Sequence, residues 1–394
     1  MPEAYPMRGT HAALDRAIDG HLSLVEAIAA IPAPSFGEAE RGAYIADRFR
    51  EAGLLDVAID EAGNVRGLFA GGGPAPRVVL AAHMDTVYPT EAHQPPRREG
   101  ARLTGSSVRD NAAAVAALVT LARAMRDVGA SVPCALEFAS TTGEEGLGDL
   151  RGIRHRLRPE EVRPEAVLIG DGRMGQIVHQ GIAVRRFAVR FETDGGHSWG
   201  DYGAPSAIHH LAPVIHALAR TPLPVDPKTT LNVGVIHGGT SVNAIASTAE
   251  IQVDFRSVEA ARVDELTALL RRLVEAEVAA GVRTTTKVIG DRPGGRISAD
   301  HPLVAGILDV HRAHGLTPQL SASSTDANIP LSLGIAAVSM GVSGGGQVHS
   351  PREWLDTTSL LPGLHLLADA VAKTVEVAAA GPAAARRGGA SGHP

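Results

Sequence analysis

Short apolar runs that end in polar residues dominate the hydrophobic pattern of the chain. Three of them, residues 78–82, 135–140 and 166–169, have the length and the mainly apolar character of strands buried in a sheet, and the first is uninterrupted. An Ala-, Val- and Leu-rich segment between the first two, Ala112–Met125, has the composition of a buried helix. This β-α-β order predicts an α/β domain with a parallel or mixed sheet.

Amphipathic patterns flank this predicted sheet. Leu14–Ala30 has helical periodicity, and Ser35 with Glu38 three residues later has the form of a capping box for a helix that ends near Glu51. The remaining expected elements are strands at 56–59, 64–69 and 336–341 and helices at 301–315 and 360–376. The pattern therefore divides the α/β domain into two parts, 1–180 and 293–380.

The pattern changes between these two parts. Alternating strands are expected at 183–192, 231–237, 248–256 and 284–289, with helices at 205–219 and 262–279. Their β-α-β-β-α-β order is that of a ferredoxin-like unit. We therefore expect residues 181–292 to form an inserted domain. A tail rich in Gly, Ala, Arg and Pro, residues 381–394, is expected to be disordered.

Composition narrows the functional classes. The chain has 394 residues, of which 44% are hydrophobic, and this is enough for two domains with substantial cores. Its net charge of -6 argues against nucleic acid or an anionic membrane as the main partner. A single cysteine, Cys134, excludes a disulfide framework within the chain. With no apolar leader or membrane-length segment in the pattern, we expect a cytoplasmic protein.

Several imidazoles and carboxylates lie just after predicted strands, and one carboxylate lies at the start of a predicted helix. Side chains alternate faces along a strand, so His83 and Asp85 are expected to point the same way at a sheet edge where α/β proteins place ligands. The candidate set is His83, Asp85, Asp110, Glu144, Glu145, Asp171 and His349. Imidazole and carboxylate ligands without thiolates suit catalytic Zn²⁺, Mn²⁺ or Co²⁺, and five ligands fit two ions that share a bridging carboxylate. A spare carboxylate beside a ligand, Glu144 next to Glu145, suits a general base.

The ordered motifs His83-Met84-Asp85, Asp110-Asn111, Glu144-Glu145, Asp171 and His349 resemble metallopeptidase family 20, from about Leu14 to Lys373. Its members include aminoacylase, carboxypeptidase G, peptidase T and succinyl-diaminopimelate desuccinylase. The resemblance implies a mixed-sheet, zinc-exopeptidase-like catalytic domain with an inserted ferredoxin-like lid and dimerisation domain. It also implies cleavage of an amide bond in a small peptide or N-acyl amino acid.

The resemblance further implies a role for each candidate. Asp110 would bridge two zinc ions, with His83 and Asp171 on one and Glu145 and His349 on the other. Asp85 would clamp the His83 ring, Glu144 would be the general base, and the Asp110–Asn111 peptide bond would be cis. In the lid, which would also form a homodimer, His197 would stabilise an oxyanion. The implied substrate-binding residues are Asn243 and Arg256, which would hold a substrate carboxylate, and Gly345.

Two positions depart from the family pattern. Arg109 precedes the bridging Asp110, where family members usually have small residues, so this side chain either narrows the pocket or turns outward. Position 171 holds Asp rather than Glu, and among relatives Asp there is more similar to aminopeptidases and dipeptidases than to deacylases. The size and class of the substrate therefore stay open.

Three other hypotheses compete with amide hydrolysis at a metal pair. Gly341-Val342-Ser343-Gly344-Gly345 fits the G-x-S-x-G pattern of a serine hydrolase, whose triad would need His365 with Asp356 or Asp369. A non-catalytic binding protein on the same fold is the second hypothesis. Hydrolysis of an unusual C–N bond in a small catabolite on the same metal site is the third.

Overall fold

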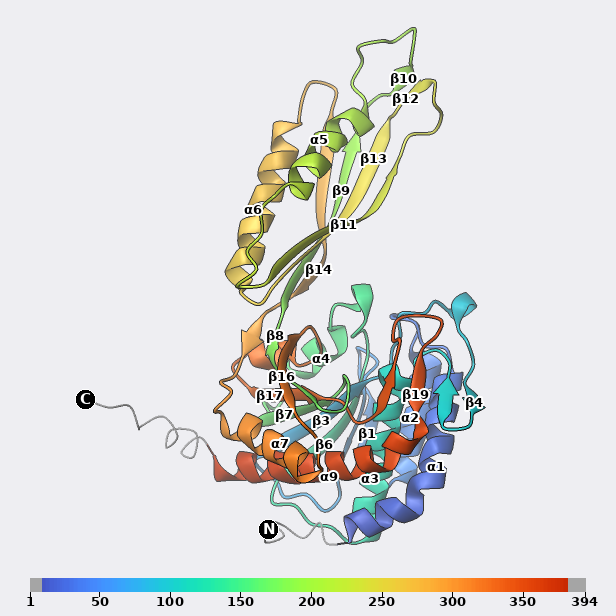
Figure 1. Ribbon diagram of the computed structural model, residues 1–394, viewed down its shortest axis with the longest axis vertical. Helices are drawn as coiled ribbons and strands as arrows, with labels where there is room; N and C mark the ends of the chain where they lie inside the picture. Colours follow the sequence, from blue (N-terminus) through green and yellow to red (C-terminus); the bar gives the residue numbers. More distant parts are fainter. Residues whose placement is uncertain (1–8, 382–394) are drawn as a thin grey trace, which may run out of the picture. The chain divides into compact units, whose positions relative to one another are not determined.

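The computed structural model describes residues 9–381. They form two compact units, one of residues up to 181 together with those from 295 onward, and one of residues 182–294 (Figure 1). Apart from Gly381, the tail expected to be disordered lies outside the described residues. None of the helices in the described part of the chain has the length and apolar character that a bilayer crossing needs.

A mixed sheet forms the centre of the first unit. Its strand order is β1-β2-β6-β3-β7-β17-β8-β15, and β16 also pairs with β8. The strands are β1 (Leu55–Ile59), β2 (Val65–Leu68), β3 (Arg77–His83), β6 (Ala135–Thr141), β7 (Ala166–Gly170), β8 (Gln176–Gly181), β15 (Gly295–Arg296), β16 (Gln319–Ser323) and β17 (Ala336–Met340). β3, β6, β7 and β17 are parallel neighbours. The predicted mixed α/β sheet is confirmed.

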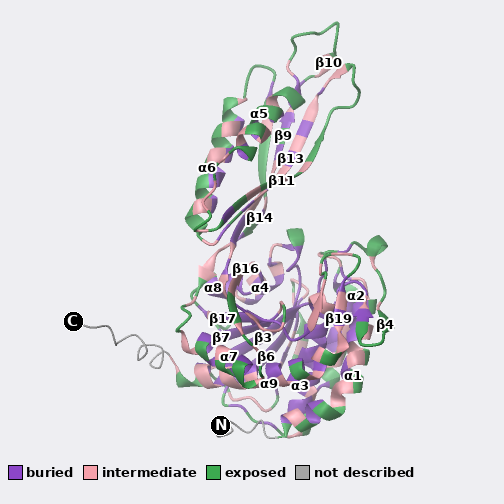
Figure 2. Cartoon of the chain, in the orientation of Figure 1, coloured by how far each residue is buried: buried purple, intermediate pink, exposed green. Residues whose placement is uncertain are grey.

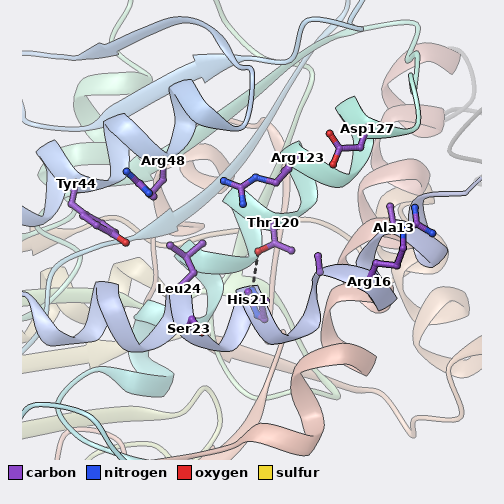
Figure 3. Close-up of a pocket in the computed structure, with 12 residues that line it drawn as sticks. Ala13, Arg16, His21, Ser23, Leu24, Tyr44, Arg48, Thr120, Arg123 and Asp127 are labelled. Carbon is purple, nitrogen blue, oxygen red and sulfur yellow. Dashed lines mark hydrogen bonds between the residues drawn. The ribbon is translucent and has the colours of Figure 1, made fainter.

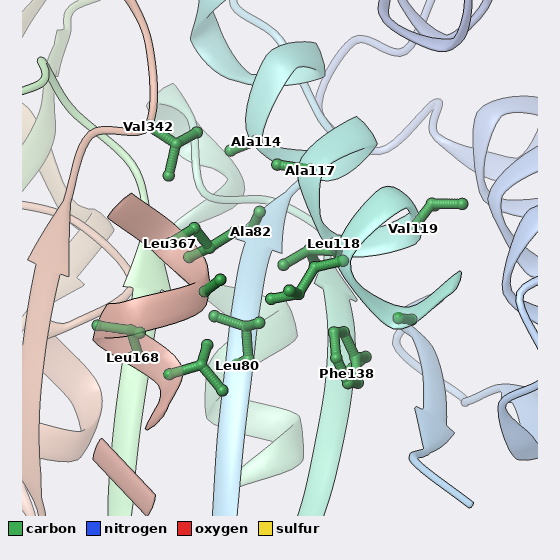
Figure 4. Close-up of a cluster of buried hydrophobic side chains, with 14 of the residues drawn as sticks. Leu80, Ala82, Ala114, Ala117, Leu118, Val119, Phe138, Leu168, Val342 and Leu367 are labelled. Atoms are coloured by element: carbon green, nitrogen blue, oxygen red, sulfur yellow. The ribbon is translucent and has the colours of Figure 1, made fainter. Parts of the chain in front are cut away.

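Both faces of these central strands are buried because their side chains alternate between two apolar clusters. Leu80 and Ala82 belong to the larger cluster, together with residues of the helices on that face (Figure 4). Val79 and Ala81 belong to the cluster on the opposite face. In Figure 2 the central strands β3, β6 and β7 are coloured as buried. The continuous apolar runs in the sequence therefore reflect a sheet covered on both sides.

Helices and a small second sheet complete this unit. The helices are α1 (Thr10–Ala30), α2 (Ala39–Glu51), α3 (Ala113–Asp127), α4 (Arg151–Arg156), α7 (Pro302–Ala313), α8 (Asn328–Ser332) and α9 (Leu360–Ala380). The small antiparallel sheet has the order β18-β19-β5-β4. Its strands are β4 (Arg97–Glu99), β5 (Arg102–Thr104), β18 (Gly344–Gly346) and β19 (Trp354–Asp356). Because these strands are only three residues long, their sequence carries little periodicity, and the hydrophobic pattern does not predict them.

The second unit has the predicted ferredoxin-like topology. Its strands β9 (Ala183–Glu192), β11 (Thr229–Gly238), β13 (Thr248–Ser257) and β14 (Arg283–Arg292) form an antiparallel sheet with the order β11-β13-β9-β14. Helices α5 (Ala207–Ala219) and α6 (Ala260–Ala276) pack on this sheet through an apolar cluster that includes Phe187, Leu211 and Leu270. A short ribbon of β10 (Gly196–His197) and β12 (Ala244–Ile245) lies between its main elements in the sequence.

The capping box predicted at Ser35 is wrong. α2 begins at Ala39, and no side chain caps its first turn. The Ser35 hydroxyl instead donates to Asp85 Oδ2 at 2.7 Å, and the Glu38 carboxylate accepts from Arg151 at 2.6 Å and from the Gly143 N–H at 3.1 Å. Both side chains therefore tie the start of α2 to the polar edge of the sheet.

A cavity of about 490 Å³ lies between α1, α2 and α3 and contains none of the candidate site residues (Figure 3). At its edge the buried His21 places Nδ1 3.0 Å from Thr120 Oγ1, which joins α1 to α3. Burial lowers the pKa of His21 to about 4. The ring is therefore neutral in the folded protein at neutral pH.

This histidine is expected to make the protein sensitive to acid. The unfolded chain takes up a proton at His21 near the ordinary imidazole pKa of 6.5, whereas the folded chain resists protonation until about pH 4. Stability is therefore lost as the pH falls through this window, by about 2 kcal/mol at pH 5. His21→Gln should remove this loss, measured as the difference in free energy of unfolding between pH 7.5 and pH 5. His209→Gln, at an exposed position on α5, is the control, and equal pH dependence in His21→Gln and wild type would refute the assignment.

Candidate metal centre

Three parallel strands deliver candidate side chains to one edge of the sheet. β3 ends at His83, β6 is followed after two residues by Glu144 and Glu145, and β7 is followed directly by Asp171. Neighbouring parallel strands present their carboxyl ends on the same side, which is where open α/β sheets bind ligands. The structure thus brings these side chains together, as the strand ends predict.

Asp110 lies between two groups of potential ligands. His83, Asp110 and Asp171 offer ligand atoms that all lie within 4.8 Å of one another, and so do Asp110, Glu145 and His349. Asp110 Oδ1 is 3.1 Å from His83 Nε2, while Asp110 Oδ2 is 3.2 Å from His349 Nε2. His349 Nε2 is also 2.8 Å from Glu145 Oε1. One carboxylate therefore faces both groups, one oxygen to each.

Glu144 belongs to neither of these two groups. It forms a third one with His83 and Glu145 under the same distance criterion. Glu144 and Glu145 are each 6% exposed, so both carboxylates lie inside the site. Geometry alone thus allows Glu144 to act as a ligand or as a general base beside the ligands.

Asp85 organises the turn that carries Glu144 and Glu145. Its carboxylate accepts the backbone N–H groups of both residues at 2.9 Å and the Ser35 hydroxyl at 2.7 Å. His83 Nδ1 lies 3.1 Å from the Asp85 carbonyl oxygen and 3.5 Å from its carboxylate. These contacts leave His83 Nε2 facing Asp110. The side chain of Asp85 therefore positions the turn as well as the ring.

The electrostatics of this site reflect crowded carboxylates. Burial raises the pKa of Asp171 to about 6, and the negative charge of Asp110 adds to this effect. Burial opposes ionisation of Asp110, but contacts with His349 and His83 outweigh it and hold its pKa far below the usual range. Hydrogen bonds to Asp110 and Glu145 raise the pKa of His349 to about 10. The site thus has an excess of carboxylates, and a positive charge placed among them would stabilise their ionised forms.

The residues present fit a pair of divalent cations. Four carboxylates and two imidazoles converge in a largely buried site, and an uncompensated cluster of this kind is costly. Nitrogen and oxygen donors without thiolates are the set that catalytic zinc and related ions accept. The donor chemistry and the two groups that share Asp110 are both consistent with two ions.

The segment that carries Asp110 is held by residues that were not predicted. The Asp110–Asn111 peptide bond is cis, as predicted. Glu353, which is 1% exposed, accepts the backbone N–H groups of Arg109 and Asp110 at 3.0 Å and the Tyr88 hydroxyl at 3.2 Å. The Asp110 side chain does not cap α3. The burial of Glu353 and its contact with this backbone are not visible in the sequence, so no sequence signal identified the residue.

Another buried acid, Asp326, was also missed. Its carboxylate accepts from Thr141 Oγ1, at the end of β6, at 2.5 Å. Burial raises the pKa of Asp326 to about 7. The residue lies in a loop between β16 and α8 without hydrophobic periodicity, so the sequence pattern gave no reason to select it.

In the second unit, His197 is an exposed residue on β10. Its Nδ1 accepts the backbone N–H groups of Trp199 and Gly200, both at 3.2 Å. Because Nδ1 acts as an acceptor, a neutral ring carries its proton on Nε2. The backbone carbonyl of Asn243 accepts the Ser198 N–H at 3.1 Å, so Asn243 lies beside the ribbon that carries His197.

Arg256 is not brought to this ribbon. It lies near the far end of β13, eight residues beyond Thr248, which corresponds to about 27 Å of extended strand. Its guanidinium already contacts both carboxylate oxygens of Asp254, at 2.7 and 3.2 Å. Asn243 and Arg256 therefore do not form a joint carboxylate clamp within this unit.

The serine hydrolase hypothesis has no support in the geometry. Ser343 is 2% exposed, and within residues 9–381 its hydroxyl makes no hydrogen bond to a histidine. His365 contacts Asp15 at 2.9 Å, and Asp369 contacts His11 and His314. The strand, turn and glycines produced the motif, but the proposed triad is not assembled.

Comparison with known proteins identifies the family. The model of the peptidase family M20/M25/M40 matches residues 79–373, well over half of the chain. The chain belongs to this family. It is therefore an enzyme, a hydrolase of amide bonds, and a peptide substrate fits this family. The predicted resemblance is confirmed.

Relatives within the M20 family differ in the reactions their names describe. The chain is 29% identical to a probable carboxypeptidase of Aspergillus clavatus over 65% of its own length and 64% of the relative's. It is 27% identical to an acetylornithine deacetylase of Vibrio vulnificus, over 84% of this chain and 90% of the relative. The relatives therefore support the family but do not select a substrate.

Solved structures share the fold at low identity. The dipeptidase Dug1p of Saccharomyces cerevisiae has a TM-score of 0.77 at 14% identity, with 95% of this chain and 99% of that chain covered. A Staphylococcus aureus tripeptidase has a TM-score of 0.75 at 22% identity, with 92% and 99% covered. A Bacillus subtilis protein with a TM-score of 0.67 at 16% identity, over 92% and 99% of the two chains, is described as a dinuclear metal-binding peptidase of this family.

Proposed function

We propose that the protein is a binuclear metal-dependent hydrolase that cleaves an amide bond of a small peptide or an N-acyl amino acid. The observation that carries this proposal is the pair of ligand groups that share Asp110. His83 and Asp171 would hold one ion with Asp110, and Glu145 and His349 would hold the other. Zinc is the proposed metal, with manganese or cobalt as substitutes.

A pair of divalent cations in such a site supplies Lewis acidity toward the scissile carbonyl and toward water. A side chain of the protein would then transfer the protons. Glu144 would take a proton from the attacking water and deliver it to the leaving amine. Its position is fixed because its backbone N–H donates to Asp85 Oδ1 at 2.9 Å. This contact holds the backbone of the proposed base beside the proposed ligands.

His197 is proposed to stabilise the developing oxyanion through its Nε2–H. Its support is the Nδ1 acceptor geometry, which favours the required tautomer. We propose that His197 acts across a homodimer formed through the inserted domain. β11 is an edge strand with several exposed residues, which suits pairing with a second copy. A cytoplasmic location completes the proposal.

An activity panel with reconstituted metal tests this function. The metal-stripped protein is loaded with zinc, manganese or cobalt and assayed on dipeptides, tripeptides and N-acetyl amino acids. We expect release of a free amine from at least one class, and loss of this activity with a chelator. Activity that survives complete metal removal, or no hydrolysis of any amide by the protein carrying two ions, would overturn the proposal.

A further inference from the structure

Arg109 introduces a positive charge into the carboxylate-rich site. Its backbone N–H donates to Glu353 Oε1 at 3.0 Å, as does that of Asp110. Burial raises the pKa of Asp171, and the charge of Arg109 partly opposes this rise. These backbone contacts hold Arg109 directly beside Asp110, the carboxylate that both ligand groups share.

The stem of Arg109 lies against the glycine strand β18. A Cβ built on Gly345 would lie 3.1 Å from Arg109 Cδ and 2.2 Å from the Trp354 carbonyl oxygen. Gly345 also has a φ of 145°, which L side chains rarely adopt. A side chain at position 345 would therefore collide with its surroundings. Glycine there lets β18 pass close to the Arg109 stem.

The guanidinium of Arg109 makes no hydrogen bond or ion pair within residues 9–381, and its Nε is buried without a partner. Two other arginines illustrate the usual pairing. Arg156, also in the first unit, makes two hydrogen bonds to Glu137 at 2.6 and 2.8 Å, and Arg256 engages Asp254. A buried polar atom without a partner is costly. Because Arg109 lies beside the candidate metal centre, its unpaired guanidinium points to an anion supplied from outside the chain.

We propose that Arg109 forms a subsite for a second carboxylate of the substrate, next to the scissile amide. The inference rests on the proposed amide hydrolysis and adds a substrate class, N-acyl amino acids or short peptides with an acidic group beside the bond that is cleaved. A guanidinium suits this role because it can form two parallel hydrogen bonds to a carboxylate. It also offsets the repulsion that Glu144, Glu145 and Asp171 exert on an anionic substrate.

The test uses pairs of substrates in which one member has a carboxylate and the other has the corresponding uncharged amide. N-acetylglutamate and N-acetylglutamine vary the amine side, and N-succinylalanine and N-succinamoylalanine vary the acyl side. For wild type we expect a preference for the acid in kcat/KM on at least one side. Arg109→Gln should lower kcat/KM for that acid by about 10- to 100-fold and leave the paired amide within about threefold. Arg109→Lys should restore part of the loss, since it keeps the charge but not the two-pronged contact.

A binding measurement separates this inference from the proposed function. Calorimetry with the metal-loaded protein compares glutarate with its monoamide, glutaramate, in wild type and Arg109→Gln. The inference expects glutarate to lose about tenfold in affinity and glutaramate to be little changed. Arg97→Gln, an exposed arginine on β4 of the same small sheet, is the control and should behave as wild type.

Each outcome decides one of the two proposals. Equal loss for acid and amide probes in Arg109→Gln, or no acid preference in wild type by either method, would overturn the carboxylate subsite. If wild type hydrolyses none of the four substrates but binds glutarate through Arg109, the subsite stands and these amides are not the substrates. Absence of any amide hydrolysis in the wider panel would overturn the proposed function alone.

Discussion

Glu144→Gln is expected to retain two metal ions per chain and to lower kcat by about 10²- to 10⁴-fold, the usual contribution of a general acid–base group. The substitution keeps the shape of the side chain and removes the site that accepts a proton. The backbone N–H of residue 144 still donates to Asp85, so the turn should be preserved. Metal content is measured by mass spectrometry and kcat by amine release at saturating substrate.

Two matched variants sharpen this prediction. Glu145→Gln alters the neighbouring carboxylate, which lies 2.8 Å from His349, and should lower metal content together with activity. Glu99→Gln, at an exposed position on β4, should change neither. The contacts also allow Glu144 itself to be a ligand with His83 and Glu145. If Glu144→Gln loses a metal ion, the role of general base is wrong, and if kcat is unchanged, the residue has no catalytic role.

The sequence predicted the parts of the fold in which local pattern and burial agree. Val78–Ala82 is continuously apolar because both faces of β3 are covered, and parallel pairing then places the residues after β3, β6 and β7 at one edge. The alternating strands of the second unit have one face against helices α5 and α6, which gave their period-two pattern. In both cases, the periodicity reports which faces are buried.

Other features depend on contacts between side chains that the hydrophobic pattern does not show. Ser35 has the spacing of a helix cap, but Asp85, 50 residues away, accepts its hydroxyl. Arg256 has the chemistry of a carboxylate ligand, but Asp254, two residues away on the same strand, already occupies its guanidinium. Glu353 is recognisable only once the small sheet containing β19 brings it to the backbone of Asp110. Long-range contacts therefore place Ser35 and Glu353, whereas the ion pair of Arg256 is local.

Asp110→Ala is expected to remove both metal ions and to reduce activity to the background rate. Asp110 Oδ1 faces His83 and Oδ2 faces His349, so this one side chain serves both ligand groups. By contrast, His83→Ala and His349→Ala each remove a ligand from one group, and each should retain about one ion per chain at a zinc concentration that saturates wild type. Metal stoichiometry of the four proteins, measured after equilibration in the same zinc buffer, therefore distinguishes a bridging carboxylate from an ordinary ligand.

The fold should survive Asp110→Ala because the side chain does not cap α3, and Glu353 binds the backbone rather than the carboxylate of residue 110. Burial raises the pKa of Asp171, and the negative charge of Asp110 raises it further. Removal of the Asp110 charge therefore also relieves a repulsion between the two carboxylates. A circular dichroism spectrum equal to that of wild type would therefore accompany the loss of metal. If Asp110→Ala instead retains one ion, Asp110 belongs to a single site, and the bridged pair of ions proposed for this enzyme is wrong.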